Sequence, residues 1–116
     1  MIKVKIDRRD PTMLHDQVAA DIRRAIADGE ATSGEKLPPA RDLAAILEVN
    51  TNTVLRALRI LRDEGLLEFR RGHGITVSGG AVQKSIVLNK ATELVRISRH
   101  EGYGRDELLQ LIKSIP

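Results

Sequence analysis

The residues Val-Asn-Thr-Asn-Thr-Val at positions 49–54 mark the start of a helix in the middle of the chain. Asn50 is a good N-cap, because its side-chain oxygen can accept a hydrogen bond from a free backbone N–H two or three residues later, and Thr53 follows at capping-box spacing. We therefore expect a helix from Thr51. The apolar positions that follow are Val54, Ala57, Leu58 and Leu61, and the polar positions between them are Asn52, Arg56 and Arg59. This helical spacing predicts one face in the core and an opposite face free to contact a partner.

The segments on both sides of this helix predict a winged helix-turn-helix. Residues 40–47 have an apolar stripe of their own, and only Glu48 and Val49 separate them from the N-cap, so two short helices joined by a tight turn are expected. Gly65 stands where a left-handed residue ends a helix. Two short apolar runs, 66–70 and 75–77, then flank the basic, glycine-bearing residues 71–74. This pattern predicts a β-hairpin, in other words a wing.

The motifs recur in a known order. They are Gly34-x-x-Leu37-Pro38-Pro39-x-Arg41-x-Leu43-Ala44, the residues 49–54, Glu64-Gly65-Leu66-Leu67, and Arg70-Arg71-Gly72-His73-Gly74. From about Pro11 to Val77 the chain resembles the winged-helix DNA-binding domain of the GntR family of bacterial transcription regulators. The short remainder resembles the YtrA-type subfamily, whose members carry only a small helical dimerisation tail. Three positions depart from the family pattern: Pro39 replaces a capping Ser, Glu48 a frequent Gly, and Thr51 a Pro or Arg.

The resemblance implies a mainly α fold with a small β-wing, divided into a winged helix-turn-helix DNA-binding domain at 1–78 and a helical dimerisation tail at 79–116. It implies a sequence-specific DNA-binding transcription regulator, a repressor that binds a palindromic operator as a homodimer. Arg41 and Arg56 carry guanidinium groups suited to guanine, and the amide of Asn52 suits adenine. The expected DNA-binding residues are Arg41, Asn50, Thr51, Asn52, Thr53, Arg56, Arg59, Arg70, Arg71, Gly72, His73 and Gly74. An alternative for Arg41 is a surface salt bridge with Asp42 or Glu48.

The tail carries more apolar surface than a piece of its size can bury. Residues 78–80, Ser-Gly-Gly, predict a hinge, one helix should follow from Val82 to Gly102, and a shorter one should open near Gly104. Two such helices cannot cover both apolar stripes alone, so they should pack against a second copy of the tail or against the first helix of the same chain. We expect the second copy, and the residues expected to hold the dimer are Ile86, Val87, Leu94, Val95, Leu108 and Ile112.

The first part of the chain predicts a short strand and a helix. Residues 1–6 alternate like a strand, and Thr12 is the expected cap of a helix whose stripe recurs every four residues from Leu14 to Ile26. Asp28 and Gly29 should end that helix. Arg23 and Arg24 are candidates for contacts with a phosphate backbone, with solvated side chains as the equal alternative. Lys36 and Leu37 are expected to add a short strand beside the wing.

Composition excludes several classes of protein. With 116 residues the chain is one small domain plus an appendage, and its charge of +3 is too modest to indicate nucleic acid without the clustering of arginines. The absence of Cys rules out disulfides and thiolate metal sites and suits the cytoplasm, and no apolar run is long enough for a signal peptide or a membrane span. One Phe, one Tyr and no Trp offer no stacking platform for single strands, so double-stranded DNA is the expected partner.

Two other classes of function fit the sequence less well. A winged helix used only for protein contacts should have an apolar or acidic outer face on its second helix, whereas this one has Asn52, Arg56 and Arg59. Some members of the family are fused to an aminotransferase-like domain, and 116 residues are too few for such a domain. The sequence also shows no pairing of a nucleophile with a base. His15 and His100 have no second metal ligand at helical spacing. We therefore expect no enzyme, no cofactor and no metal, and the sequence does not identify a small-molecule effector.

Overall fold

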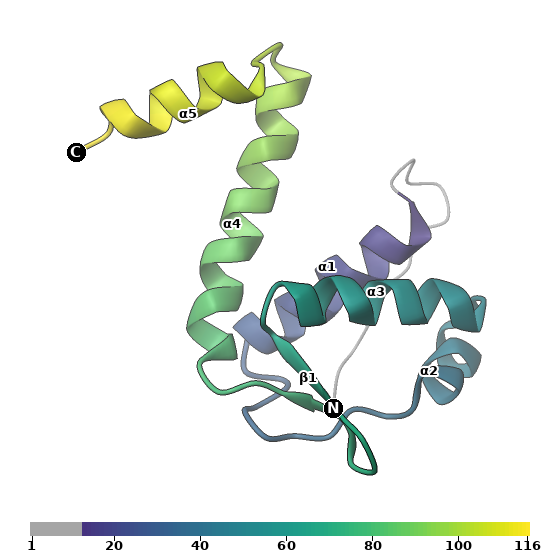
Figure 1. Ribbon diagram of the computed structural model, residues 1–116. Helices are drawn as coiled ribbons and strands as arrows, with labels where there is room; N and C mark the ends of the chain where they lie inside the picture. Colours follow the sequence, from purple (N-terminus) through teal and green to yellow (C-terminus); the bar gives the residue numbers. More distant parts are fainter. Residues whose placement is uncertain (1–12) are drawn as a thin grey trace. The chain divides into compact units, whose positions relative to one another are not determined.

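The computed structural model describes residues 13–116 and is mostly helical (Figure 1). Its elements are α1 (Leu14–Ala27), α2 (Ala40–Leu47), α3 (Thr51–Asp63), β1 (Leu67–Arg70), β2 (Gly74–Val77), α4 (Ala81–His100) and α5 (Arg105–Ser114). This confirms the expected mainly α class with a small antiparallel sheet. The strand expected at 1–6 and the cap expected at Thr12 lie outside the described residues. Met13 precedes α1 and makes no side-chain capping hydrogen bond.

The chain forms two compact units, and the boundary between them falls inside α4, between Ile86 and Val87. The first turn of α4 therefore belongs to the unit that carries the helix-turn-helix, and Ala81 and Ser85 in that turn are fully buried. The second unit, from Val87 to the end of the chain, is called the tail below.

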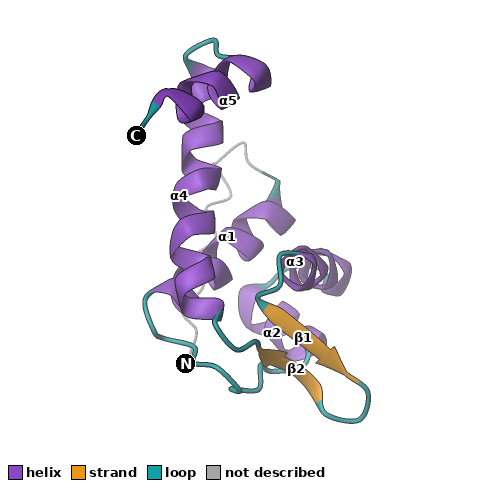
Figure 2. Cartoon of the chain, turned by 60° about the vertical axis from the view of Figure 1, so that its left-hand side comes forward, coloured by secondary structure: helices purple, strands orange, loops and turns teal. Residues whose placement is uncertain are grey.

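The core of the first unit lies around α3, which packs against α1, α2 and β1 (Figure 2). The predicted stripe on α3 is fully buried, as are Val18, Ile22 and Ile26 on α1. The buried residues of the α3 stripe are Val54, Ala57, Leu58 and Leu61. Figure 1 shows α2 beside the N-terminal end of α3. The turn between the two helices therefore fixes the position of the end of α3 that is expected to read DNA.

That turn forms around two backbone features. The Asn50 Oδ1 accepts a hydrogen bond from the Asn52 N–H at 2.7 Å, which confirms the predicted N-cap. Before it, Glu48 adopts a left-handed conformation with φ 56° and ψ 43°, which L-residues other than Asn and Asp rarely adopt. Pro39 offers α2 no side-chain cap, and its carbonyl instead accepts hydrogen bonds from the N–H groups of Asp42 and Leu43 at 2.9 and 3.0 Å.

The wing is a two-stranded hairpin whose pairing runs from Leu67 opposite Val77 to Arg70 opposite Gly74. Gly74, expected in the tip, is thus the first paired residue of β2. Gly65, with φ 81°, ends α3 as predicted. Lys36 forms an isolated bridge with Thr76, so the segment before α2 does lie along the free edge of the wing.

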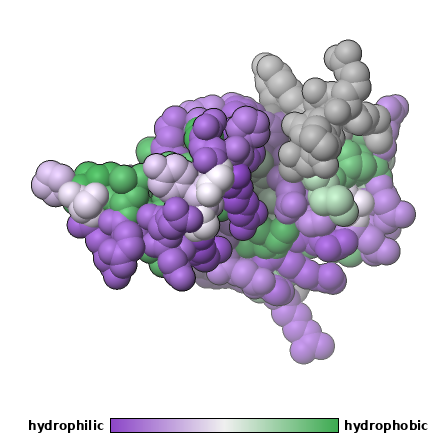
Figure 3. Space-filling model, turned by 90° about the horizontal axis from the view of Figure 1, so that it is seen from above, coloured by the Kyte–Doolittle hydropathy of each residue, from purple (hydrophilic) through white to green (hydrophobic). Residues whose placement is uncertain are grey.

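The tail consists of the rest of α4 and of α5, joined by a tight turn. Gly102 has φ 85°, and the N–H of Gly104 donates to the Glu107 side chain at 3.0 Å, so helix ends fall at the two predicted glycines. Inside the tail Leu108 and Ser98 are buried, at 6% and 7% exposure. Most other apolar side chains of the tail are exposed, and apolar atoms are visible between hydrophilic ones in Figure 3. Within residues 13–116, none of the helices has the length and apolar character needed to cross a bilayer.

Candidate nucleic-acid interface

The N-terminal turn of α3 combines an open helix end with polar side chains. Thr51 and Asn52 are exposed, Thr53 is half-buried, and no acidic residue occurs in this turn. The positive end of the helix dipole is therefore not compensated locally, which favours a phosphate or another anion at this end. The Asn50 side chain caps the helix, so it orients the turn and has less hydrogen-bonding capacity left for DNA.

Three exposed arginines lie on the two helices of the helix-turn-helix. Arg41 is exposed on α2, and Arg56 and Arg59 are exposed on the outer face of α3. Across the part of the chain that the structure describes, none of the three forms an ion pair, and Arg41 bonds neither to Asp42 nor to Glu48. Their guanidinium groups are consequently free to bind base edges or phosphates.

The two candidate arginines of α1 both form ion pairs, Arg23 a largely buried one and Arg24 partly exposed ones, so Arg23 is neither a solvated side chain nor available to phosphate. Arg23 is only 5% exposed, and its Nε and Nη2 donate to the two carboxylate oxygens of Glu64 at 2.9 and 2.8 Å. The pair joins α1 to the C-terminal end of α3. The sequence offered no local signal for it, because the partners lie 41 residues apart.

Arg24 is held by three carboxylates. Its guanidinium donates to Glu30 at 2.6 Å, to Asp21 at 2.9 Å and to Asp28 at 3.0 Å. The hydrogen bond with Glu30, followed by that with Asp21, raises the pKa of Arg24 above its ordinary value. The charge of Arg24 is therefore neutralised by its own neighbourhood.

The wing also has one arginine in an ion pair and one without. Arg70 donates to Glu68 at 3.1 Å. This ion pair is exposed, so it weakens the attraction of Arg70 for phosphate but leaves the side chain accessible. Arg71 and His73 are exposed at the tip, and within residues 13–116 Arg71 has no ion pair. Gly72 between them has φ 81°, a left-handed conformation that glycine adopts without strain because it has no Cβ.

The structure adds a cation that the sequence analysis left out of the interface. Lys36 is exposed and pairs with Thr76, and its Cε lies 2.9 Å from where a Cβ on Gly74 would be. The end of its side chain therefore lies over Gly74, next to the tip of the wing. The expected edge strand at Lys36 was the signal that could have placed this residue beside the wing.

The expected dimerisation residues differ in exposure. Ile86, Val87, Leu94 and Ile112 are exposed, with Val87 at 68%. Val95 is half-buried, and Leu108 is already buried within the tail. These four exposed residues therefore have apolar surface that a second copy of the chain could bury.

Known proteins resemble this chain both in the winged helix-turn-helix and over nearly its whole length. The sequence model for bacterial regulatory proteins of the gntR family matches residues 14–77, which run from α1 to the end of the wing. The HTH-type transcriptional repressor YtrA of Bacillus subtilis is 31% identical over 119 residues, covering 97% of this chain and 91% of that protein.

Solved structures agree. YtrA from Sulfolobus acidocaldarius, a GntR-family transcription factor, is 33% identical with a TM-score of 0.63 and covers 79% of this chain and 97% of that one. AraR(DBD) in complex with operator ORE1 shares the fold at 24% identity, with a TM-score of 0.57 and coverage of 66% of this chain and 93% of that one.

Proposed function

We propose that this chain, which belongs to the GntR family of bacterial regulatory proteins and is a DNA-binding transcription regulator, acts as a homodimeric repressor on a palindromic operator. The observation that carries the proposal is that the N-terminal turn of α3 has no acidic residue and that Arg41, Arg56 and Arg59 are exposed and form no ion pair within residues 13–116. Repression is supported by the name of the B. subtilis relative, a transcriptional repressor.

Base reading belongs to the exposed face of α3. The N-terminal part of the helix enters the major groove, where Arg56 and, from α2, Arg41 donate to guanine O6 and N7. Asn52 is exposed and offers both an amide donor and an acceptor, the pattern that adenine requires.

Phosphate contacts hold the protein in register. The positive end of the α3 helix dipole attracts backbone phosphates beside the recognition helix, and the hydroxyls of Thr51 and Thr53 bind their oxygens. At the wing, Arg71 and His73 reach the adjacent minor groove or backbone, and Lys36 beside Gly74 adds a further cation near the tip. Arg59 lies one turn farther along α3 and meets the flanking phosphates.

Dimerisation supplies the second half-site. One recognition helix reads only a few base pairs, so selectivity needs two copies about one helical turn of DNA apart. The exposed apolar residues of the tail support an interface between copies, because an apolar surface rimmed by polar groups marks an interaction site. A homodimer related by a two-fold axis binds a palindrome.

The test is selection of bound fragments from a random duplex library, followed by affinity measurements on the enriched sequence over a range of salt concentrations. We expect a palindromic motif and a log–log salt slope that falls by roughly 0.9 for each phosphate neutralised. A library without an enriched motif, or a slope near zero, would instead favour a winged helix that contacts protein.

A further inference from the structure

The first turn of α4 is built into the unit that carries the helix-turn-helix. Ser78, just before the helix, donates its N–H to the carbonyl of Leu66 at 2.9 Å, and its own carbonyl accepts from the Ser33 hydroxyl at 3.2 Å. Ala81 and Ser85 in the turn itself are fully buried. The Ser-Gly-Gly segment that the sequence predicts to be a hinge is thus hydrogen-bonded at its first residue and followed directly by a buried turn.

Lys84 adds an electrostatic contact on the same turn. Its side chain reaches Gly65, the residue that ends α3, and its Nζ lies 2.6 Å from the position of a Cβ built on that glycine. Lys84 forms no ion pair within residues 13–116, so its charge acts on the C-terminal end of α3, where the helix dipole is negative. The recognition helix and the helix that leads into the tail are therefore linked at Gly65.

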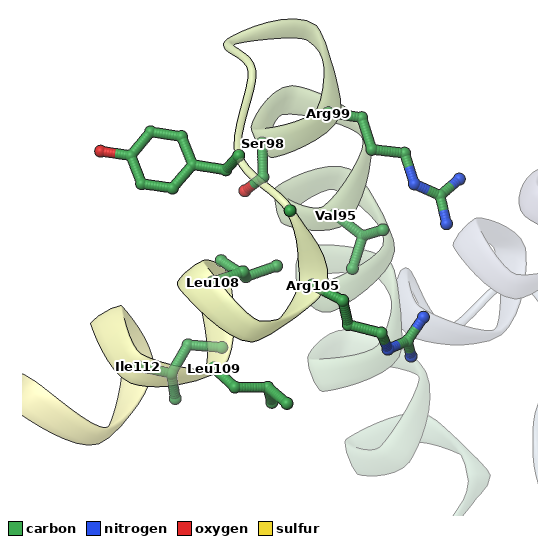
Figure 4. Close-up of a pocket in the computed structure, with 9 residues that line it drawn as sticks. Val95, Ser98, Arg99, Arg105, Leu108, Leu109 and Ile112 are labelled. Carbon is green, nitrogen blue, oxygen red and sulfur yellow. The ribbon is translucent and has the colours of Figure 1, made fainter.

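Beyond the unit boundary, α4 continues without a break and carries α5. Figure 4 shows where the two helices meet, and Val95 and Ser98 of α4 and Arg105 and Leu108 of α5 line a common cleft there. Leu108 is buried in this contact. Because α5 packs on the last turns of α4, it follows any tilt of that helix.

A small tilt at the start of α4 has a large effect at its end. Residues 87–100 of α4 span roughly 20 Å, because each helical residue adds about 1.5 Å. A tilt of about 10° in the first turn therefore displaces the far end by about 3.5 Å, close to the rise of one base pair. A shift of one base pair also turns a half-site by about 35° around the DNA axis. A firmly held first turn thus favours one half-site spacing, and a loosely held one tolerates several.

We propose that this first turn is an anchor that sets the half-site spacing of the operator, with Lys84 as a positioning residue. The anchor consists of Ser78, Ala81, Lys84 and Ser85. The inference rests on the proposed function, because a spacing exists only for a dimer on two half-sites. A flexible linker would tolerate a range of spacings, since the effective concentration at the second half-site changes slowly with distance. The anchor removes this freedom, so the protein selects spacing as well as base sequence.

The test uses full-length protein and duplexes that carry the enriched half-site twice, with the spacing between the copies changed one base pair at a time. Fluorescence anisotropy gives the affinity for each duplex and for a single half-site. We expect the unmodified protein to prefer one spacing by roughly tenfold or more over the spacings one base pair longer and shorter. Equal affinity over three neighbouring spacings would overturn the proposal.

Substitutions of lysines in α4 test the positioning residue. Lys84→Met removes the ammonium group from the end of α3 and should lower the spacing preference by about two- to fivefold, with the affinity for a single half-site unchanged. Lys84→Arg keeps the charge and should keep the preference. Lys90→Met is the matched control, because Lys90 is an exposed lysine of the same helix beyond the boundary, where it pairs with Glu93 at 3.8 Å.

Two results with these variants would contradict the role of Lys84. One is an equal loss of spacing preference in Lys84→Met and Lys90→Met. The other is a fall in the half-site affinity of Lys84→Met with no change in spacing preference, which would make Lys84 a residue of structural importance only.

Amide hydrogen exchange tests the anchor without DNA. The Ser78 N–H, which is bonded to Leu66, should exchange about as slowly as amides in the buried part of α3. A Ser78 amide that exchanges as fast as the amide of exposed Gly79 would show that the segment opens as a hinge, and the anchor would then not exist.

The outcomes also separate this inference from the proposed function. A monomer by light scattering that binds one half-site would overturn the proposed function and, with it, the inference on spacing. A dimer that binds the palindrome equally well at several spacings would overturn the inference alone.

Discussion

Glu48 carries the backbone conformation on which the turn between α2 and α3 depends. Among residues 13–116 it is the only residue other than glycine with a positive φ. The left-handed region costs an L-residue roughly 1–2 kcal/mol, because its Cβ crowds the following carbonyl oxygen. Relatives often have glycine here, so this chain holds its helix-turn-helix at a local cost that the packing of α2 and α3 offsets.

Replacement of Glu48 by glycine should therefore stabilise the protein, whereas replacement by another L-residue should not. We expect Glu48→Gly to exceed Glu48→Ala by about 1 kcal/mol in the free energy of unfolding, measured by urea denaturation. Both variants lose the same carboxylate, so the difference isolates the strain at Cβ. Equal stabilities would show that the turn relaxes around an L-residue at no cost.

The ion pair between Arg23 and Glu64 is a second single-residue feature with a large expected effect. Glu64→Ala leaves a buried guanidinium without its partner and should lower the free energy of unfolding by about 3 kcal/mol. Asp63→Ala is the matched control, since its pair with Arg62 is exposed and should contribute below about 1 kcal/mol. Arg23→Met combined with Glu64→Leu should recover most of the loss, because it removes both buried charges. If Glu64→Ala and Asp63→Ala are equally mild, the pair is not structural.

At the scale of the element, α3 separates base reading from structural support along its length. Its first turns carry free polar groups, whereas at its last turn Arg62 donates to Asp63 at 3.2 Å and lies over the Phe69 ring, 5.0 Å from the centroid. The contact with Phe69 links α3 to β1. The C-terminal end of the helix thus holds the wing, and the N-terminal end remains available for DNA.

This division predicts different effects for two arginines of one helix. Arg56→Ala should weaken binding to the selected operator by about 1–3 kcal/mol and barely change binding to random duplex, as expected for a base contact. Arg62→Ala should change neither by more than about 0.5 kcal/mol, because its guanidinium is already engaged. Fluorescence anisotropy with both duplexes measures the difference. An equal loss on operator and random DNA for Arg56→Ala would make it a phosphate contact.

At the scale of the whole molecule, the helix α4 connects the DNA-binding unit to the tail without a break in secondary structure. Its first turn, with Ala81 and Ser85 fully buried, is part of the unit that carries the helix-turn-helix. Lys84 of the same turn has its Nζ 2.6 Å from where a Cβ on Gly65 would be, so it lies over the C-terminal end of α3. A truncation that removes the tail should therefore end after Ile86, because one after Ser78 would expose the core.

The dimer itself is tested in the full chain. Leu94→Asp combined with Ile112→Asp places unpaired carboxylates on two exposed apolar positions and should cost several kcal/mol per dimer if these positions are covered by a second copy. Light scattering should then report a monomer that binds an operator half-site weakly and loses its preference for the palindrome. Thr92→Asp, on an exposed polar position of α4, should remain dimeric. A double variant with full dimer mass and operator affinity would move the interface to another surface.

The sequence alone determined the features that depend on neighbours within a turn or two: the start of α3 at Thr51, the Asn50 cap, the buried stripe of α3 and the glycine that ends it. Caps and helical periodicity act over three or four residues, and the sequence displays them directly. Tertiary structure decided which arginines are free. Arg23 and Arg56 are both charged residues on helices, but only Arg23 meets a carboxylate from 41 residues away, and two hydrogen bonds hold that pair. The same long-range packing set the unit boundary at Ile86 and brought Ser98 and Arg105 into one cleft, because both depend on how helices pack against each other and not on spacing along the chain.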